Sequence, residues 1–402
     1  MFKSIELPKL NDHIKSLHHF FEDNMDSFLG YPCNGKFDYR PLYPFLDYPL
    51  NNVGDPFVSS NFSLNTHAIE REVISIFQSL TGADPKKTWG YCTNGGTEGN
   101  MYGLFLAREI YPKGIVYFSE ETHYSVNKII KCLNIDCAQV RTTSKGKMDI
   151  DHLNDLLLKN KERPAIMVCN VGTTMTGAID DLEAIKNSLK RNSINQFYIH
   201  ADAALSGMIL PFVKDPQAWS FSSGIDSISV SGHKMIGSPI PCGIVLAKSK
   251  NISHISQDVE YVGSKDTTIP GSRNAISPVF LWYQLKKMGF KGFQSMIMDC
   301  FDVSDFAIKM FKAYGMEAWR HNNSVTVVFK RPSHTLIKKW QLAVKGETAH
   351  IITMPHVTKK KVVQFVKEVA EDRERQKLKR PSKNYLKALK SVSSDSKQAS
   401  SL

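Results

Sequence analysis

The sequence of 402 residues has no long apolar run. Its apolar stretches, such as residues 115–118 and 243–247, stop far short of the roughly 20 residues that a membrane-spanning helix needs. The first ten residues carry charges and a proline where a secretory signal would have an apolar core. We therefore expect a cytoplasmic protein that does not span a membrane.

Cysteine pairs of the kind that bind zinc or build disulfide frameworks are also missing. The seven cysteines are an odd number, and none of them stands in a Cys-x-x-Cys pair. Most lie within apolar stretches, which favours buried thiols. We expect neither disulfides nor a metal site.

Acidic residues are too few to balance the basic ones, with 39 Asp and Glu against 51 Lys and Arg, and the net charge is +12. Residues 371–402 hold nine basic and four acidic residues and become rich in serine, so they contribute +5, while the other +7 is spread along the chain. We interpret this segment as a flexible tail that aids solubility or targeting. Binding to nucleic acid or an anionic membrane is the alternative.

The remaining composition is that of an ordinary globular protein, with 42% hydrophobic and 22% charged residues. Short runs rich in Ile and Val alternate with helix-like segments, which is typical of a parallel sheet covered on both faces. The helical period is clearest over residues 66–80, where Gly82 follows as a stop signal. The predicted strands are residues 115–118, 165–169, 197–199, 227–230 and 243–247.

The pattern changes after a helical stretch near residues 278–287. Strand candidates at 325–329 and 350–353 are followed by a helix with apolar residues between 362 and 369. We predict an α/β protein with a smaller C-terminal α+β domain. The predicted parts are an N-terminal segment (1–60), a large domain (61–290), a small domain (291–370) and the tail (371–402).

A glycine-rich motif, TNGGTEGN at residues 93–100, precedes a helix-compatible run. The first N–H groups of a helix are unpaired and carry the positive end of its dipole, and glycine lets an anion approach the backbone closely. Gly95, Gly96 and Thr97 therefore form a candidate phosphate loop. A tight turn that needs a flexible backbone is the alternative.

Two further motifs follow buried strands. Asp202 ends the strand-like run FYIHAD and shares a strand face with His200. A carboxylate at such a strand end can hold a cationic ligand group, or it can cap the next helix. The turn SGHK at 231–234 then brings Ser231, His233 and Lys234 together. Burial there would lower the pKa of the lysine and make its amine nucleophilic.

In this order, the motifs resemble the pyridoxal-phosphate enzymes of the aspartate-aminotransferase fold (fold type I), and among them the group II amino-acid decarboxylases. The resemblance covers residues 30–370 and is greatest to the short bacterial histidine decarboxylases, with plant serine decarboxylases similar. It implies a mostly parallel central sheet and pyridoxal 5'-phosphate as the cofactor. The matching segments are 93–100, 122–125, 170–174, 229–234, 271–274, 340–343 and 350–358.

The resemblance also implies roles for single residues. Lys234 would form the Schiff base with the cofactor, and Asp202 would pair with the ring nitrogen. His123 would lie against the ring and contact the substrate carboxylate, although a hydrogen-bonded core histidine is the alternative. Ser231 and His233 would join Gly95, Gly96 and Thr97 around the phosphate.

Two positions are less settled by the resemblance. Tyr261, in a turn-rich loop, is the candidate for protonating the substrate carbon, although loop tyrosines at a surface are common. After Arg273-Asn274 the family usually continues Gly-His, whereas this chain has Ala275-Ile276, which puts the contribution of that pair in doubt.

The function that the resemblance implies is a lyase, a homodimeric histidine decarboxylase that makes histamine and has its active site near the subunit interface. Decarboxylation of L-serine or another small amino acid is the nearest alternative. An aminotransferase or aldolase of the same fold would use the same lysine and aspartate. Nucleic acid is not an expected partner, because an intact lysine turn would have no purpose in such a binder.

Overall fold

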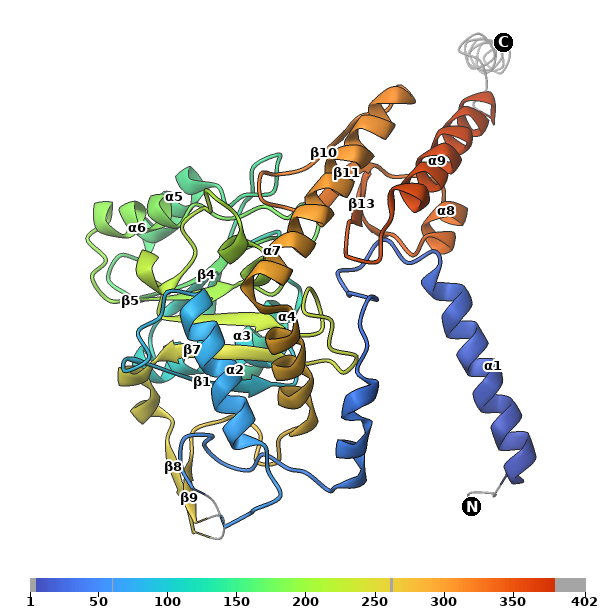
Figure 1. The fold of residues 1–402 in the computed structure, drawn as a ribbon. Helices are drawn as coiled ribbons and strands as arrows, with labels where there is room; N and C mark the ends of the chain where they lie inside the picture. The colour runs from blue at the N-terminus through green and yellow to red at the C-terminus, as the bar shows by residue number, and fades with distance from the viewer. Residues whose placement is uncertain (1–4, 60, 261–262, 380–402) are drawn as a thin grey trace, which may run out of the picture.

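The computed structural model describes residues 5–59, 61–260 and 263–379, and its centre is a seven-stranded sheet (Figure 1). The strand order is β1-β7-β6-β5-β4-β2-β3. Strand β7 pairs antiparallel with β1 and β6, and the other pairs are parallel, which confirms the predicted α/β class. The strands are β1 (Thr88–Thr93), β2 (Ile115–Ser119), β3 (Asp136–Val140), β4 (Ala165–Asn170), β5 (Phe197–Asp202), β6 (Ser227–Ser231) and β7 (Gly243–Lys248).

Helices cover both faces of this sheet because its strands carry apolar side chains on both sides. In β4, Met167 and Cys169 join the core cluster that includes α2, α5, α6 and α7, while Ile166 and Val168 join the cluster with α3 and α4. Side chains alternate along a strand, so one continuous apolar run serves both clusters. The helices are α2 (His67–Leu80), α3 (Gly96–Ile110), α4 (Ser125–Leu133), α5 (Ile150–Lys159), α6 (Leu182–Arg191) and α7 (Ile276–Ala313).

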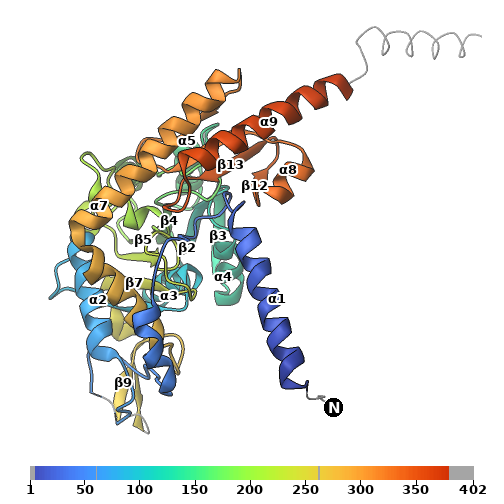
Figure 2. The same cartoon turned by 45° about the vertical axis from the view of Figure 1, so that its right-hand side comes forward.

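A second, four-stranded antiparallel sheet follows α7, which bends at Gly289. Its strand order is β10-β11-β13-β12, and α9 packs near the second half of α7 (Figure 2). This part matches the α+β pattern expected for the C-terminal region. Its elements are β10 (Ala318–Trp319), β11 (Thr326–Lys330), α8 (His334–Lys339), β12 (Ala343–Lys345), β13 (Thr348–Ile352) and α9 (Lys359–Lys379).

The chain before α2 contacts both sheets: the Leu29 carbonyl accepts from the N–H of Ile352 in β13, and the N–H of Asn34 donates to the Lys234 carbonyl after β6. Helix α1 (Leu7–Met25) stands away from the rest of the fold in both ribbon views and has no buried residue (Figures 1 and 2). Among the described residues, no helix is long and apolar enough to cross a bilayer. The short 3-10 helices are η1 (Arg40–Asp47), η2 (Ser206–Met208), η3 (Leu210–Phe212), η4 (Phe221–Ser223) and η5 (Ser249–His254).

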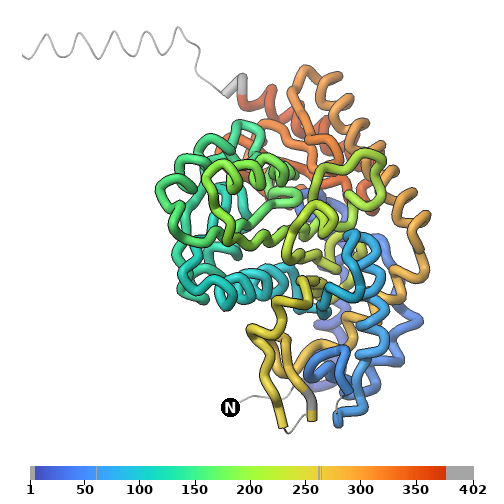
Figure 3. The backbone as a smooth tube through the Cα atoms, turned by 90° about the vertical axis from the view of Figure 1, so that its left-hand side faces the viewer, coloured from blue at the N-terminus to red at the C-terminus, as the bar shows by residue number. Residues whose placement is uncertain are grey.

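A two-stranded hairpin, β8 (Gln257–Val259) and β9 (Ser264–Asp266), projects from the body of the fold (Figure 3). The N-terminal segment lies against it, since the backbone N–H of Asp55 donates to the carbonyl of Lys265 at 3.2 Å. The hairpin is therefore held by the segment that precedes α2.

Candidate active site

The carboxyl ends of neighbouring strands bring polar side chains to one edge of the central sheet. Asn170 ends β4, Asp202 ends β5 as its register partner, and Ser231 ends β6. Ligands of open α/β sheets bind at this edge, and here it borders a cavity of about 400 Å³. The lining includes Gly96, Thr97, Asn100, His123, Asn170, Asp202, Ser231, His233, Lys234, Ser324 and His350.

Lys234 reaches this cavity from the turn after β6. The turn is fixed by its backbone, because the N–H of Gly232 donates to the carbonyl of Cys242 at 2.8 Å. Asn34 braces it from the N-terminal segment: its N–H donates to the Lys234 carbonyl at 3.2 Å and its side-chain amide to the Met235 carbonyl at 3.1 Å. Burial lowers the pKa of Lys234, against the opposing effect of Asp202, so the neutral, nucleophilic amine becomes more accessible.

The glycine-rich motif forms the loop between β1 and α3. Gly95 has a φ of 138°, and a Cβ on Gly96 would lie 2.8 Å from the hydroxyl oxygen of Ser231, so a side chain there would block the loop. Thr97, Ser231 and His233 all line the cavity beside it. This arrangement offers backbone N–H groups at a helix start together with two hydroxyls, which suits a phosphate.

Asp202 is buried, and both of its carboxylate oxygens have partners. Asn100 donates through Nδ2 to Oδ2 at 2.8 Å, and the backbone N–H of Ala204 donates to Oδ1 at 3.2 Å. A carboxylate has about four acceptor positions, so it can still accept a proton-bearing ring nitrogen from the cavity. The bond to Ala204 is a local turn contact and not a helix cap, because the next helix, η2, begins at Ser206 with Leu205 as its N-cap and no side-chain cap bond.

His123 lies just before α4, and its Nδ1 is 2.8 Å from the hydroxyl oxygen of Ser125. Burial lowers its pKa, against the opposing effect of Asp202, which favours a neutral ring. A neutral imidazole beside the cavity can lie against an aromatic ligand without the cost of burying a charge.

The structure thus brings seven of the predicted site residues around one cavity. Gly95 is adjacent to the cavity and is not among its lining residues, and Tyr261 lies outside the described residues, beyond the end of β8. The roles given to these residues stay predictions. The seven that line the cavity are Gly96, Thr97, His123, Asp202, Ser231, His233 and Lys234.

Sequence reasoning gave no role to several other lining residues. Asn100 and His350 lie in the segments 93–100 and 350–358, which match the family, so the resemblance pointed to these positions but assigned them no role. His350 Nε2 lies 3.0 Å from the Gly30 carbonyl and its Nδ1 lies 3.0 Å from the Met175 carbonyl. It joins the small sheet to the N-terminal segment and to a loop of the large sheet.

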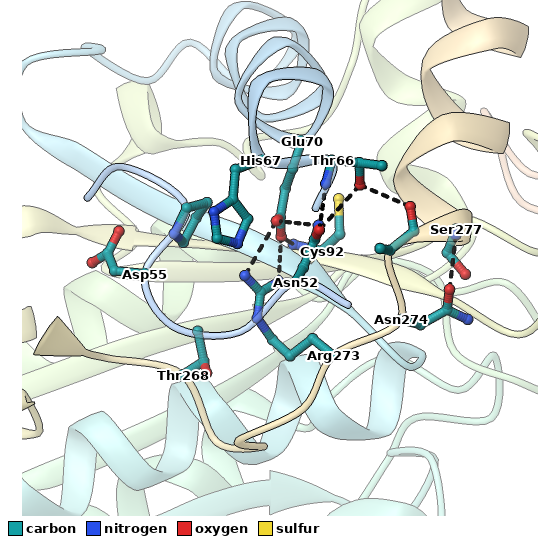
Figure 4. A network of polar contacts seen from close by, with 12 residues as sticks. Asn52, Asp55, Thr66, His67, Glu70, Cys92, Thr268, Arg273, Asn274 and Ser277 are labelled. Carbon is teal, nitrogen blue, oxygen red and sulfur yellow. Dashed lines mark hydrogen bonds and ion pairs between the residues drawn. The ribbon is translucent and has the colours of Figure 1, made fainter. Parts of the chain in front are cut away.

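Arg273 and Asn274 of the motif at 271–274 make contacts that hold the architecture together, and neither lines the cavity (Figure 4). Arg273 and Glu70 form a buried ion pair through both carboxylate oxygens, and Arg273 also donates to the Gly54 carbonyl at 3.0 Å. Glu70 further accepts from the Asn52 side-chain amide and the Cys92 backbone N–H, each at 2.8 Å. One ion pair therefore ties together the N-terminal segment, α2, β1 and the loop before α7.

Comparison with known proteins agrees with this geometry. Residues 75–331 match the pyridoxal-dependent decarboxylase conserved domain. The chain belongs to the pyridoxal-dependent decarboxylase family. A histidine decarboxylase of Vibrio anguillarum is 46% identical over 352 residues, or 86% of this chain and 91% of that relative. One from Acinetobacter baumannii is 47% identical over 330 residues, or 82% of this chain and 86% of the relative.

The solved structures agree as well. The L-methionine decarboxylase of Streptomyces sp. 590 superposes on the decarboxylase described here with a TM-score of 0.84 at 25% identity, over 92% of this chain and 96% of that one. The aspartate-aminotransferase-like fold expected from the sequence is thereby confirmed.

The residues at the cavity fit pyridoxal 5'-phosphate, the cofactor of this family. The cofactor needs an amine for its aldehyde, an anion for its ring nitrogen and donors for its phosphate. Lys234, Asp202 and the loop at Gly96 supply these three groups around one cavity. A side chain on Gly96 would collide with Ser231, so only glycine lets the loop backbone and the Ser231 hydroxyl lie side by side at the cavity.

Proposed function

We propose that this decarboxylase converts L-histidine to histamine and carbon dioxide. The observation that carries the substrate is the identity of 46–47% to histidine decarboxylases over more than four-fifths of the chain. That identity extends beyond the conserved domain, since 352 matched residues exceed the span 75–331.

Lys234 would hold the cofactor through its side-chain amine until the substrate amine replaces it. Its lowered pKa keeps a share of the free amine neutral, which is the form that can attack the aldehyde of the cofactor. Once released, Nζ is free to carry a proton to or from the substrate within the cavity. Asn34 keeps the turn in place while the side chain moves.

Asp202 would accept the proton-bearing ring nitrogen and keep it protonated. Bound pyridoxal phosphate supplies a sink for the electron pair that the departing carboxylate leaves behind. Asn100 and Ala204 already hold the Asp202 carboxylate in place. The carboxylate therefore would not have to reorganise when the electron pair moves into the cofactor ring. His123 would lie against the ring, contact the substrate carboxylate and limit the access of water.

The proposal includes a homodimer, supported by the apolar stripe of α1. Leu7, Leu10, Ile14, Leu17 and Phe21 recur at helical spacing and are all exposed. A helix with an uncovered stripe of this kind is stable when a partner covers it. A cytoplasmic location is also part of the proposal, since all seven cysteines are free thiols, as in a reducing compartment.

The dimer is tested by light scattering on the full-length chain. Leu10→Lys should shift the measured mass from two chains to one, whereas Ser16→Lys, on the polar side of α1, should leave it unchanged. A wild-type mass of one chain, or a dimer that survives Leu10→Lys and Leu17→Lys together, would contradict the proposal.

The reaction is tested by incubating the purified protein with pyridoxal phosphate and separate amino acids. We expect carbon dioxide from L-histidine and histamine as the amine identified by mass spectrometry. If ethanolamine from L-serine is the main product, the substrate is L-serine instead of L-histidine, and the decarboxylation chemistry stands. Amino-group transfer without carbon dioxide would refute the decarboxylase assignment for this chain.

A further inference from the structure

A row of four buried polar side chains runs from behind the central sheet to the cavity. Ser227 Oγ lies 2.8 Å from His200 Nδ1, and His200 Nε2 lies 3.0 Å from Asn100 Oδ1. Asn100 Nδ2 then donates to Asp202 Oδ2 at 2.8 Å. The exposed fraction of these four side chains' residues ranges from 0% to 7%, so water does not compete for their hydrogen bonds.

The chemistry of these groups fixes the direction of every bond in the row. An ionised carboxylate only accepts, so the amide nitrogen of Asn100 faces Asp202 and its oxygen faces His200. His200 must therefore carry its proton on Nε2, and its Nδ1 accepts the hydroxyl proton of Ser227. Burial, against the opposing effect of Asp202, lowers the pKa of His200 to about 4, which is consistent with this single neutral tautomer.

Two glycines on one face of α3 allow this arrangement. A Cβ on Gly103 would lie 2.2 Å from His200 Nδ1, and one on Gly99 would lie 2.2 Å from Ser229 Oγ. Helix α3 can therefore approach β5 and β6 only where these side chains are missing. This close approach carries Asn100 to within hydrogen-bond distance of Asp202.

We propose that Asn100 is a positioning residue whose amide, oriented by His200 and Ser227, holds the Asp202 carboxylate directed at the ring nitrogen of the cofactor. If His200 carried its proton on Nδ1, the amide would turn its oxygen toward Asp202, and two acceptors would repel each other. The inference rests on the cofactor assignment of the proposed function and not on the substrate.

The test compares two replacements of Asn100 that differ in charge and in hydrogen bonding. Asn100→Asp keeps an acceptor for His200 and adds a second carboxyl beside Asp202, whereas Asn100→Leu removes both bonds without adding charge. The measured quantities are the dissociation constant of pyridoxal phosphate for the apo-protein and the absorbance spectrum of the bound cofactor, both across pH.

At neutral pH we expect Asn100→Asp to raise the dissociation constant more than Asn100→Leu does, and each by roughly tenfold or more, the equivalent of about 1.4 kcal/mol. Acidification should restore binding in Asn100→Asp, because a protonated carboxyl can donate to Asp202 as the amide does. It should not restore binding in Asn100→Leu. The other titratable groups that face Asp202 are Lys234, His123 and His200, which the wild type and both Asn100 variants share.

A purely structural role for Asn100 predicts the reverse order, since Asn100→Leu breaks the contact with His200 and Asn100→Asp keeps it. That order, or wild-type affinity and spectrum in both variants, would overturn the proposal. Failure of the wild-type protein to bind pyridoxal phosphate would refute the cofactor assignment instead. Binding by the wild type without turnover of histidine would refute only the substrate.

Discussion

The buried ion pair between Glu70 and Arg273 allows a quantitative test of what holds the N-terminal segment in place (Figure 4). The exposed fractions of the two side chains are 0% and 1%. Burial lowers the pKa of Arg273, but the charge and hydrogen bonds of Glu70 outweigh it and the pKa ends above its usual value. Arg273→Met would remove the guanidinium, keep much of the side-chain volume and leave the Glu70 carboxylate buried.

The expected cost follows from the partners that remain. Glu70 would keep its hydrogen bonds from Asn52 and Cys92 and lose both contacts to Arg273, while the Gly54 carbonyl would lose its donor. Removing one partner of a buried ion pair costs about 3–5 kcal/mol, because it leaves an uncompensated charge. We expect a decrease of about 4 kcal/mol in the free energy of unfolding, a large fraction of the ~5–15 kcal/mol of a typical protein.

An exposed ion pair between the same two helical regions is the control. Glu72 of α2 pairs with Lys286 of α7 at 2.8 Å, with exposed fractions of 50% and 53%. Lys286→Met should cost no more than about 1 kcal/mol. Urea unfolding followed by circular dichroism measures both variants, and equal losses in Arg273→Met and Lys286→Met would refute the reasoning from burial.

Three further outcomes are expected. Lys234→Ala should abolish the absorbance of the bound cofactor and lower carbon dioxide release by more than about a hundredfold, with an unchanged circular dichroism spectrum; retention of both would refute its role. The folded-state pKa of His200 is about 4 and its ordinary value is 6.5, so its stabilising neutral form is fully present above pH 6.5 and is lost as the pH falls through 4. Acidification over that range should cost the wild type on the order of 3 kcal/mol more than His200→Gln, as measured by urea unfolding; equal pH profiles would contradict this. His350 lines the cavity and His356 does not, so His350→Leu should raise KM for the amino acid more than His356→Leu does; steady-state kinetics that show equal KM values would contradict the assignment.

The sequence allowed the central strands to be predicted because they are buried on both faces. The runs at 165–169 and 243–247 carry mostly apolar residues, and the structure places β4 and β7 there. Strand β3 was missed because it lies at the edge of the sheet, where four of its five residues are exposed or partly exposed and no apolar run is needed. Strand β1 mixes threonines with aromatic residues and lacks the expected Ile and Val.

The site could be assembled from sequence only as far as the strand ends that form it. Asp202 and Lys234 follow buried strands, and parallel strands end at one edge, so their meeting was predictable. Gly30 and His350 reach the same cavity from opposite ends of the chain. Neither lies at a strand end of the central sheet, and one sequence contains no signal for contacts over 320 positions.

Ala275-Ile276, which stand where the family usually has Gly-His, fit the apolar surroundings that the structure gives them. Ala275 is buried, and its carbonyl accepts the hydroxyl of Thr66 at 2.7 Å, at the junction of α2 and α7. Ile276 begins α7 and packs against the apolar cluster that contains Tyr39 and Phe280. A histidine in that cluster would have to find a polar partner among apolar side chains, and isoleucine needs none. Neither Ala275 nor Ile276 lines the cavity of the single chain, and the pair packs instead against the start of α2 and the N-terminal segment.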